Sequence, residues 1–251
     1  MARGVQPDKH TVYYELLDAC AVSGCPICAL TLTAVTSYLQ AITYEHVNDP
    51  EFRDAIVAAR GYCNDHSWRL RELRVALGTA LMYRDVIRDA AAELARPSTG
   101  GRPDLFGAGQ GQGGMRDRLA ALAGRGTPDR GDGRIVDPHR ACPACQERDR
   151  YELLYLEALL SHIQDERMSQ AFGDAGGLCM VHLDRLIATT RQTAALARLI
   201  ALQRECLLRL HDELTEFIRK NDYRFSSEGM GVERDSWVRA VEIVAGKPGI
   251  R

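Results

Sequence analysis

The chain carries one cysteine–histidine motif twice, and this repeat constrains the fold more than any other feature. The first copy joins Cys25-Pro-Ile-Cys28 to Gly61-Tyr-Cys63-Asn-Asp-His66, and the second joins Cys142-Pro-Ala-Cys145 to Gly177-Leu-Cys179-Met-Val-His182. The spacers are nearly equal, with 34 residues between Cys28 and Cys63 and 33 between Cys145 and Cys179. Two such strings at matching separations predict an internal duplication.

The residue types in the motif are those that bind structural zinc. Such a site takes four tetrahedral ligands, commonly thiolate sulfur and imidazole nitrogen. Two cysteines three residues apart around a turn can face one ion, and a CxxH pair shares the first turn of a helix. We therefore predict that each repeat closes one structural Cys3His zinc site, giving two ions per chain. The predicted ligands are Cys25, Cys28, Cys63 and His66 in the first repeat and Cys142, Cys145, Cys179 and His182 in the second.

The same ligands leave a second hypothesis open, because sequence does not separate zinc from an iron–sulfur cluster or from a thiol-based redox switch. A thioredoxin-like dithiol is disfavoured, since the residues before Cys25 are predicted to form a helix instead of a strand. A DNA-reading zinc finger is disfavoured because a helical hairpin separates the ligand pairs. Cys20 and Cys206 have no counterpart in the other repeat and are predicted to be small core residues.

Apolar residues at three- and four-residue steps, with almost no strict alternation, predict an all-α fold. Each repeat is expected to contain a CPxC knuckle, a helical hairpin and a long helix that begins at CxxH. Asp49 suits the N-cap of the second hairpin helix, and Pro50 suits its first position. The long helices are predicted to run from about Cys63 towards Ala95 and from about Cys179 to Asn221.

The same periodicity predicts which faces of these helices are buried. A last amphipathic helix is expected around Asp235–Ala245, with Trp237 and Val241 packed onto the bundle. The expected buried positions are Leu70, Leu73, Leu77, Leu81 and Leu94 on the first long helix, and Leu186, Ile187, Leu199, Ile200, Leu207, Leu214 and Ile218 on the second.

Four regions follow from these patterns. We predict a first metal-binding repeat at 1–96, a flexible Gly/Pro/Asp-rich linker at 97–138, a second metal-binding repeat at 139–222 and a C-terminal segment at 223–251. The formal net charge of −2 indicates no general attraction to nucleic acid or to anionic membranes. The N-terminus resembles no secretory signal and no segment is apolar enough to cross a bilayer, so a cytoplasmic location is expected, where thiols stay reduced.

The sequence favours a binding or scaffolding protein over an enzyme. No nucleophile elbow, phosphate loop or dinucleotide motif is found, and closed Cys3His sites offer no open position for water. One enzymatic alternative remains, a pocket between the repeats in which Tyr44, Glu45 and His162 converge; solvated side chains, or a pairing of Glu45 with Arg53, are the simpler interpretation. A protein partner is expected, and the long apolar helix leaves a homodimer open.

The doubled motif also carries a resemblance. With "KNDYRF" and "SWVRA" near the end of the chain, the CPIC…GYCNDH and CPAC…GLCMVH strings resemble an uncharacterised family of bacterial and archaeal proteins, catalogued as a domain of unknown function. The resemblance covers nearly the whole chain. It implies that the cysteines and histidines are the family signature, and it implies no activity, substrate or partner.

Overall fold

The computed structural model of the chain describes residues 9–94 and 141–250, apart from 192 and 226. Within these ranges every regular element is a helix, which confirms the all-α prediction. The predicted 97–138 linker lies outside the described residues, so the predicted domain boundaries stay predictions.

The two halves contain helices in the same order. The N-terminal half has α1 (Lys9–Cys20), α2 (Pro26–Ala41) continued by the π-helical turn η1 (Ile42–His46), α3 (Pro50–Ala58), α4 (Asn64–Glu72) and α5 (Ala76–Leu94). The C-terminal half has α7 (Pro143–His162), α8 (Glu166–Ala175), α9 (Met180–Thr189), α10 (Ala194–Lys220), the 3-10 turns η2 (Tyr223–Phe225) and η3 (Val232–Asp235), and α11 (Ser236–Ala245). Helices α2–α5 and α7–α10 therefore follow the same order along the chain, while the internal duplication stays a prediction.

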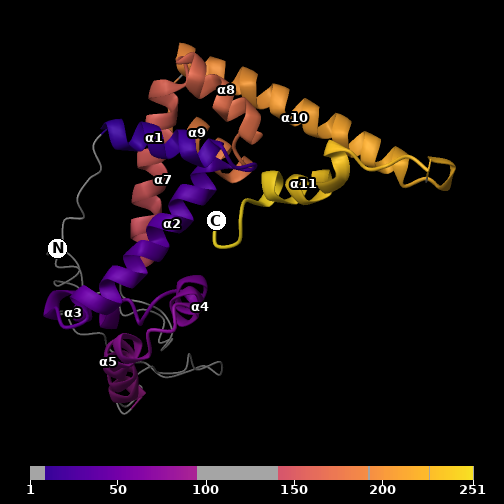
Figure 1. Cartoon of the computed structure of the whole chain (residues 1–251). Helices are drawn as coiled ribbons and strands as arrows, with labels where there is room; N and C mark the ends of the chain where they lie inside the picture. Colours follow the sequence, from indigo (N-terminus) through magenta and orange to yellow (C-terminus); the bar gives the residue numbers. More distant parts are fainter. Residues whose placement is uncertain (1–8, 95–140, 192, 226, 251) are drawn as a thin grey trace, which may run out of the picture.

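The antiparallel pair α2 and α7 forms the axis of the molecule (Figure 1). The start of α7 meets the far end of α2, where Tyr38 neighbours Cys142. Helices α1, α8 and α9 and the first turns of α10 pack around one end of the pair, with Phe172 and Leu159 fully buried among them. Helices α3, α4 and α5 pack around the other end. Each end therefore has its own apolar cluster.

Local capping explains several helix starts. Proline occupies an N-terminal position of α2, α3 and α7, where its missing amide hydrogen costs no hydrogen bond. The side chain of Asp49 accepts a hydrogen bond from the amide of Glu51 at 3.0 Å, which confirms the predicted N-cap of α3. Asp165 caps α8 in the same way, through the amide of Met168 at 3.0 Å.

The two predicted long helices are each broken, and this prediction was wrong. A turn with Arg74 at φ 56° separates α4 from α5. A second turn separates α9 from α10, where the Thr193 hydroxyl accepts a hydrogen bond from the Leu196 amide at 3.1 Å and caps the new helix. Neither turn contains glycine or proline, the residues that ordinarily signal the end of a helix.

Each break restarts the helical phase, so the predicted buried faces are only partly correct. Leu70 and Leu199 are fully buried, as expected. Leu77 and Leu94 are 75% and 67% exposed, because α5 begins afresh at Ala76 and turns another side towards α3. The other exceptions are Ile187, Ile200 and Ile218, which are 43%, 39% and 70% exposed.

The C-terminal half of α10 extends away from the α2–α7 body as an arm, with η3 and α11 packed along it (Figure 1). The predicted C-terminal helix is present as α11. Its Trp237 and Val241 were expected against the bundle but are 57% and 61% exposed. The opposite side of α11 faces inwards, with Ser236 buried and Arg239 paired with Glu213 of α10.

One helical run, Pro26–His46, is long and apolar enough by composition to cross a membrane, with a hydropathy of 1.3 over its most apolar window. This run contradicts the prediction that no segment is apolar enough to cross a bilayer. The run consists of α2 and η1, so its apolar character accompanies its position as a central helix packed on α7. Such core helices meet the same criterion.

Candidate metal centres

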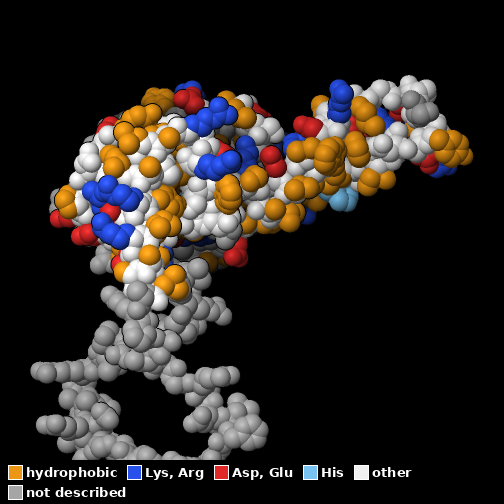
Figure 2. Space-filling view, turned by 90° about the horizontal axis from the view of Figure 1, so that it is seen from below, with side chains coloured by type: hydrophobic (Ala, Val, Ile, Leu, Met, Phe, Trp, Pro, Cys, Tyr) orange, Lys and Arg blue, Asp and Glu red, His pale blue; other side chains and the backbone are white. Residues whose placement is uncertain are grey.

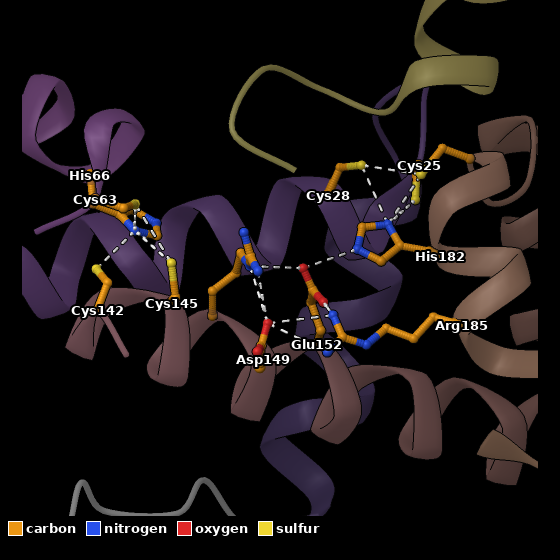
Figure 3. Close-up of polar contacts among 12 residues, drawn as sticks. Cys25, Cys28, Cys63, His66, Cys142, Cys145, Asp149, Glu152, His182 and Arg185 are labelled. Carbon is orange, nitrogen blue, oxygen red and sulfur yellow. Dashed lines mark hydrogen bonds and ion pairs between the residues drawn. The ribbon is translucent and has the colours of Figure 1, made fainter. Parts of the chain in front are cut away.

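The eight predicted ligands lie in two groups of four at opposite ends of the α2–α7 pair (Figure 3). In each group the donor atoms all lie within 4.8 Å of one another, so each could hold a metal ion. Centre A consists of Cys25, Cys28, Cys179 and His182, and centre B consists of Cys63, His66, Cys142 and Cys145.

The grouping differs from the prediction that each repeat closes its own site. Centre A joins the CPxC pair of the first half to the CxxH pair of the second, and centre B joins the reverse combination. The predicted residues are therefore brought together, but the predicted pairing within a repeat was wrong. Each centre connects the N-terminal half of the chain to the C-terminal half.

Helix lengths explain the exchange. The Pro26–His46 run has 21 residues and carries the chain about 32 Å away from Cys25. Helix α3 has nine residues and can return it by only about 14 Å. The CxxH pair of the first half is therefore left at the far end of α2, where the antiparallel α7 begins with its own CPxC pair.

Each centre lies where two helices begin. Cys25 is the N-cap of α2 and Cys179 the N-cap of α9, while Cys28 and His182 occupy their first turns. Centre B is built in the same way, from the first turns of α7 and α4. Helix N-termini direct their partial positive charge and free amides at these sulfurs, which favours the thiolate form.

The glycine of each GxC string makes the turn that brings its cysteine to the helix start. Gly61 and Gly177 have φ values of 88° and 86°, a left-handed conformation that side chains disfavour. Their amides donate hydrogen bonds back to the carbonyls of Ile56, at 2.8 Å, and Phe172, at 3.2 Å. A Cβ at Gly177 would also lie 2.6 Å from the Gln203 side chain, so this position requires glycine.

The donor spacing fits one tetrahedral ion. A Zn–S bond of about 2.3 Å and a Zn–N bond of about 2.0 Å place neighbouring sulfurs about 3.8 Å apart and sulfur and nitrogen about 3.5 Å apart. In centre A, Cys28 Sγ and Cys179 Sγ are 3.6 Å apart, and His182 Nδ1 lies 3.2–3.5 Å from the three sulfurs.

Centre B has nearly the same dimensions. Cys63 Sγ and Cys145 Sγ are 3.6 Å apart. The Nδ1 atom of His66 lies 3.2 Å from Cys63 Sγ, 3.5 Å from Cys145 Sγ and 3.6 Å from Cys142 Sγ. In both centres Nδ1 is therefore the histidine atom that faces the sulfurs.

The pKa values of the clustered thiols also favour the binding of a cation. Burial raises the pKa of Cys25, whereas hydrogen bonds from Cys25 and Cys28 lower the pKa of Cys179. A hydrogen bond from Cys145 lowers the pKa of Cys142 to about 3, and donating that bond raises the pKa of Cys145. Three adjacent thiolates repel one another unless a positive ion lies between them, so complete ionisation requires a cation.

A buried carboxylate, that of Glu152, lies next to the histidine of centre A (Figure 3). The side chain of Glu152, on α7, is 1% exposed, and its Oε1 lies 3.6 Å from His182 Nε2. The other carboxylate oxygen contacts the guanidinium of Arg185, and Arg148 Nε lies 3.6 Å from Oε1. Neither His182 Nε2 nor Glu152 Oε1 has a hydrogen-bond partner among the described residues, and an approach of a few tenths of an ångström would let Nε2–H donate to Oε1. Such a bond fixes the tautomer that leaves Nδ1 free to bind metal. The two arginines offset the buried negative charge.

Further contacts enclose centre A. Gln203, buried on α10, accepts a hydrogen bond from the Leu178 amide at 2.7 Å and donates one to the Leu178 carbonyl at 3.0 Å. The chain after α11 returns to the centre, where Ile250 is buried and a Cβ at Gly246 would lie 3.5 Å from Cys179 Sγ. These groups fix the segment that carries Cys179.

Centre B has a different surrounding. The position equivalent to Glu152, seven residues after the second cysteine of the CPxC pair, is Val35 on α2. His66 and Cys142 are buried, but Cys63 and Cys145 are only half-buried. In centre A all four ligands are at most 6% exposed. The same ligand types are thus closed off from solvent at one end of α2–α7 and partly open at the other.

Glu152 and Gln203 are not among the site residues predicted from the sequence. A signal for Glu152 was present, because it stands on the helix face that continues through Tyr155, Leu156 and Leu159, where an acidic residue is out of place. Gln203 gave no comparable signal, since its role depends on the return of α10 to the Leu178 turn.

The residues set aside from metal binding behave as follows. Cys20 and Cys206 are buried outside both centres, in agreement with their predicted core positions.

Glu45 and His162 lie at or near the ends of the antiparallel helical runs α2–η1 and α7, so they are at opposite ends of the pair. Glu45 is 72% exposed, His162 packs on Tyr13, and Arg53 binds Asp85 instead of Glu45. The described residues therefore do not form the predicted Glu45–His162 pocket.

Comparison with known proteins gives a family but no activity. The model of a family of unknown function, DUF6062, matches residues 14–249. An uncharacterised 23.9 kDa protein encoded in the xynA 3' region of Caldicellulosiruptor sp. is 23% identical over 224 residues, which cover 88% of this chain and 95% of that protein. No solved structure matches the chain.

Proposed function

The chain belongs to DUF6062, a family of unknown function, and from that premise we propose that it is a zinc-containing helical scaffold that binds another protein. Each chain holds two zinc ions, one in centre A and one in centre B. The ions join the N-terminal half to the C-terminal half, and the arm of α10 and α11 provides the binding surface.

The observation that carries the proposal is the convergence of eight sulfur and nitrogen donors into two sets of four, each within 4.8 Å. Every set has three cysteines and one histidine, the composition of closed structural zinc sites. With no ligand position left over for water or substrate, such an ion contributes to folding instead of to catalysis.

The spacing favours a single ion over an iron–sulfur cluster. A [2Fe–2S] cluster places two irons and two sulfides between its protein ligands and therefore needs donors on opposite sides farther apart than donors around one ion. The sulfur pairs at 3.6 Å and the sulfur–nitrogen pairs at 3.2–3.6 Å match one tetrahedral ion in both centres. Among single ions, closed Cys3His sites are typical of zinc.

The arm supports a binding role. It exposes several large apolar side chains (Figure 2). The most exposed of them are Tyr223 at 85%, Val232 at 79%, Ile218 at 70%, Val244 at 63%, Val241 at 61% and Trp237 at 57%. Aromatic and aliphatic groups of this kind form the centres of protein–protein interfaces.

Elemental analysis with an absorption spectrum tests the metal assignment. On protein purified without oxygen and without nickel resin, we expect two zinc ions per chain and no colour. Iron with sulfide and visible absorption would replace this proposal with a redox protein on the same ligands. Cys20→Ala, which removes a buried thiol outside both centres, is the control and should keep both ions.

Paired substitutions test which ligands share an ion. Cys28→Ser with Cys179→Ser damages centre A alone, so the double variant should lose one zinc. Cys28→Ser with Cys63→Ser damages both centres, and that variant should lose two. Sites closed within each repeat would give the opposite result, because Cys28 and Cys63 would then bind one ion together.

Association through the arm is tested by sedimentation velocity. Val241→Glu places a charge on an exposed side of α11 and should leave the fold and the zinc content unchanged while it removes binding. A second copy of the chain is the first partner to examine. If the wild-type chain stays monomeric at high concentration, the arm does not bind another copy of itself.

A further inference from the structure

Centre B contains a pair of zinc ligands that solvent can reach, and centre A does not. Cys63 and Cys145 are half-buried, whereas the sulfurs of Cys25, Cys28 and Cys179 belong to residues that are 6%, 0% and 0% exposed. Oxidants attack thiolates that are both ionised and accessible. The difference in burial therefore separates the chemistry of two centres that have the same ligand types.

The two accessible sulfurs are also adjacent. Cys63 Sγ and Cys145 Sγ lie 3.6 Å apart. A disulfide needs about 2.05 Å between the sulfurs, so a movement of under 2 Å would join them. Both cysteines lie at helix N-termini, Cys63 as the N-cap of α4 and Cys145 in the first turn of α7. The pair has the features of a dithiol that oxidises reversibly.

The surroundings of centre A oppose the same reaction. Glu152 lies next to His182 Nε2, the ring nitrogen that does not face the sulfurs. Gln203 fixes the turn before Cys179, and the returning C-terminal chain places Gly246 next to Cys179 Sγ. An oxidant must displace packed groups before it reaches these sulfurs. Centre A is enclosed by the fold, whereas centre B is bounded on one side by cysteines that reach the surface.

We propose that centre B is an oxidant-responsive zinc site: a peroxide oxidises Cys63 and Cys145 to a disulfide and releases one zinc ion, while centre A keeps its ion. This inference rests on the proposed presence of zinc in both centres. It names centre B as a modification site and hydroperoxides as the class of reactant.

The reaction balances as a two-electron oxidation. One thiolate attacks the peroxide O–O bond, which gives a sulfenic acid and hydroxide. The second thiolate attacks the sulfenic sulfur, so the S–S bond forms as the S–O bond breaks and a second hydroxide leaves. Two protons from solvent convert both hydroxides into water. Zinc is left with Cys142 and His66 as its only protein ligands and dissociates, because structural zinc needs four.

The first test follows zinc release from the intact, zinc-loaded chain after addition of hydrogen peroxide, with a dye that absorbs when it binds zinc. We expect one ion per chain, half of the total, to be released in a first phase. Peptide mass analysis should find the Cys63–Cys145 disulfide, and a dithiol reductant with added zinc should restore the original content. Release of both ions together, or a first disulfide among the cysteines of centre A, would overturn the proposal.

Two matched variants identify the source of the zinc. Cys63→Ser leaves centre A as the only complete site, and its ion should resist peroxide. Cys179→Ser leaves centre B as the only complete site, and its ion should be released as in the wild-type chain. Equal sensitivity of the two variants would contradict the proposal. A wild-type chain purified without zinc would refute the proposed function itself, whereas two zinc ions with no selective release would refute this inference alone.

Discussion

Centres A and B are built from the same four ligand types at the starts of two helices, and they differ in what lies around them. Centre A is surrounded by the larger apolar cluster, a buried carboxylate and the returning C-terminal chain. Centre B lies against the smaller cluster of α3, α4 and α5, with two ligands half-buried. Because the ligand types are the same, any difference between the two centres in metal affinity or solvent access must come from the residues around the ligands.

The largest expected effect comes from the loss of a ligand in each centre. Cys28→Ser removes a fully buried ligand of centre A and should lower the free energy of unfolding by more than about 4 kcal/mol. Cys145→Ser removes a half-buried ligand of centre B and should cost less, because fewer packed groups depend on it. Thermal unfolding of the two single variants, each loaded with zinc in its intact centre, measures the difference. Equal melting temperatures would mean that the surroundings do not matter.

The next effect tests whether packing alone separates the two ends. Leu156 on α7 is 1% exposed in the cluster around centre A, and Leu39 on α2 is 0% exposed in the cluster around centre B. Each substitution to alanine should cost about 2–5 kcal/mol, the usual range for a buried leucine. Chemical denaturation should give similar values for both. A much smaller cost for Leu39→Ala would show that centre B lies in a looser core.

Removal of the carboxylate behind His182 should weaken one centre selectively. We expect Glu152→Gln to reduce the zinc affinity of centre A about 10–100-fold, because the amide no longer stabilises the histidine tautomer as a carboxylate does. Competition with a chelator measures the affinity of each centre. Asp149→Asn, which changes a 43% exposed carboxylate on the same helix, is the control and should have little effect. A uniform loss from both centres would contradict the assigned role.

The smallest effect is an acid transition in the arm, remote from both centres. Lys220 Nζ lies 2.7 Å from Glu233 Oε1 and holds the pKa of that carboxyl at about 2, below its ordinary value of 4.5. Because the pKa is lower in the folded state, the contact contributes fully above pH 4.5 and is lost as the pH falls from 4.5 through about 2.

Trp237 fluorescence in a Trp68→Phe background reports this transition. The tryptophan lies on α11, which packs on α10 and η3. Glu233→Gln should remove the transition and leave acid-induced zinc release, recorded in parallel, as the only remaining response. If the fluorescence change persists in that variant, it belongs to the metal centres and not to the arm.

Much of this molecule could be predicted from its sequence. Local signals were sufficient for the helical class and for the start of α3, with Asp49 as its N-cap and Pro50 as its first residue. They were also sufficient for the eight ligand residues, because a short motif contains the side chains that bind metal. The partition of the ligands into centres was not predicted, since it depends on the lengths of α2 and α3 and on the antiparallel packing of α7.

Other features depend on contacts that no short stretch of sequence contains. The turns at Arg74 and Thr193 interrupt runs without glycine or proline, because packing of the helices on both sides of each turn outweighs continuous helix formation. Trp237 was expected to be buried by its apolar character, but α11 turns Ser236 inwards and leaves the indole outside. Glu152 acquires a role only when α9 brings His182 to it.

The exchange of motifs between the two halves has a consequence for ancestry. A chain with only one CPxC…CxxH unit of these helix lengths could not complete a four-ligand centre alone, but two copies related by a two-fold axis could complete two identical ones. Fusion of the copies into one polypeptide would keep both centres while freeing each from symmetry. On that origin, Glu152 on α7 and Val35 at the matching position of α2 would mark the divergence of two copies of one site, each open to its own selection.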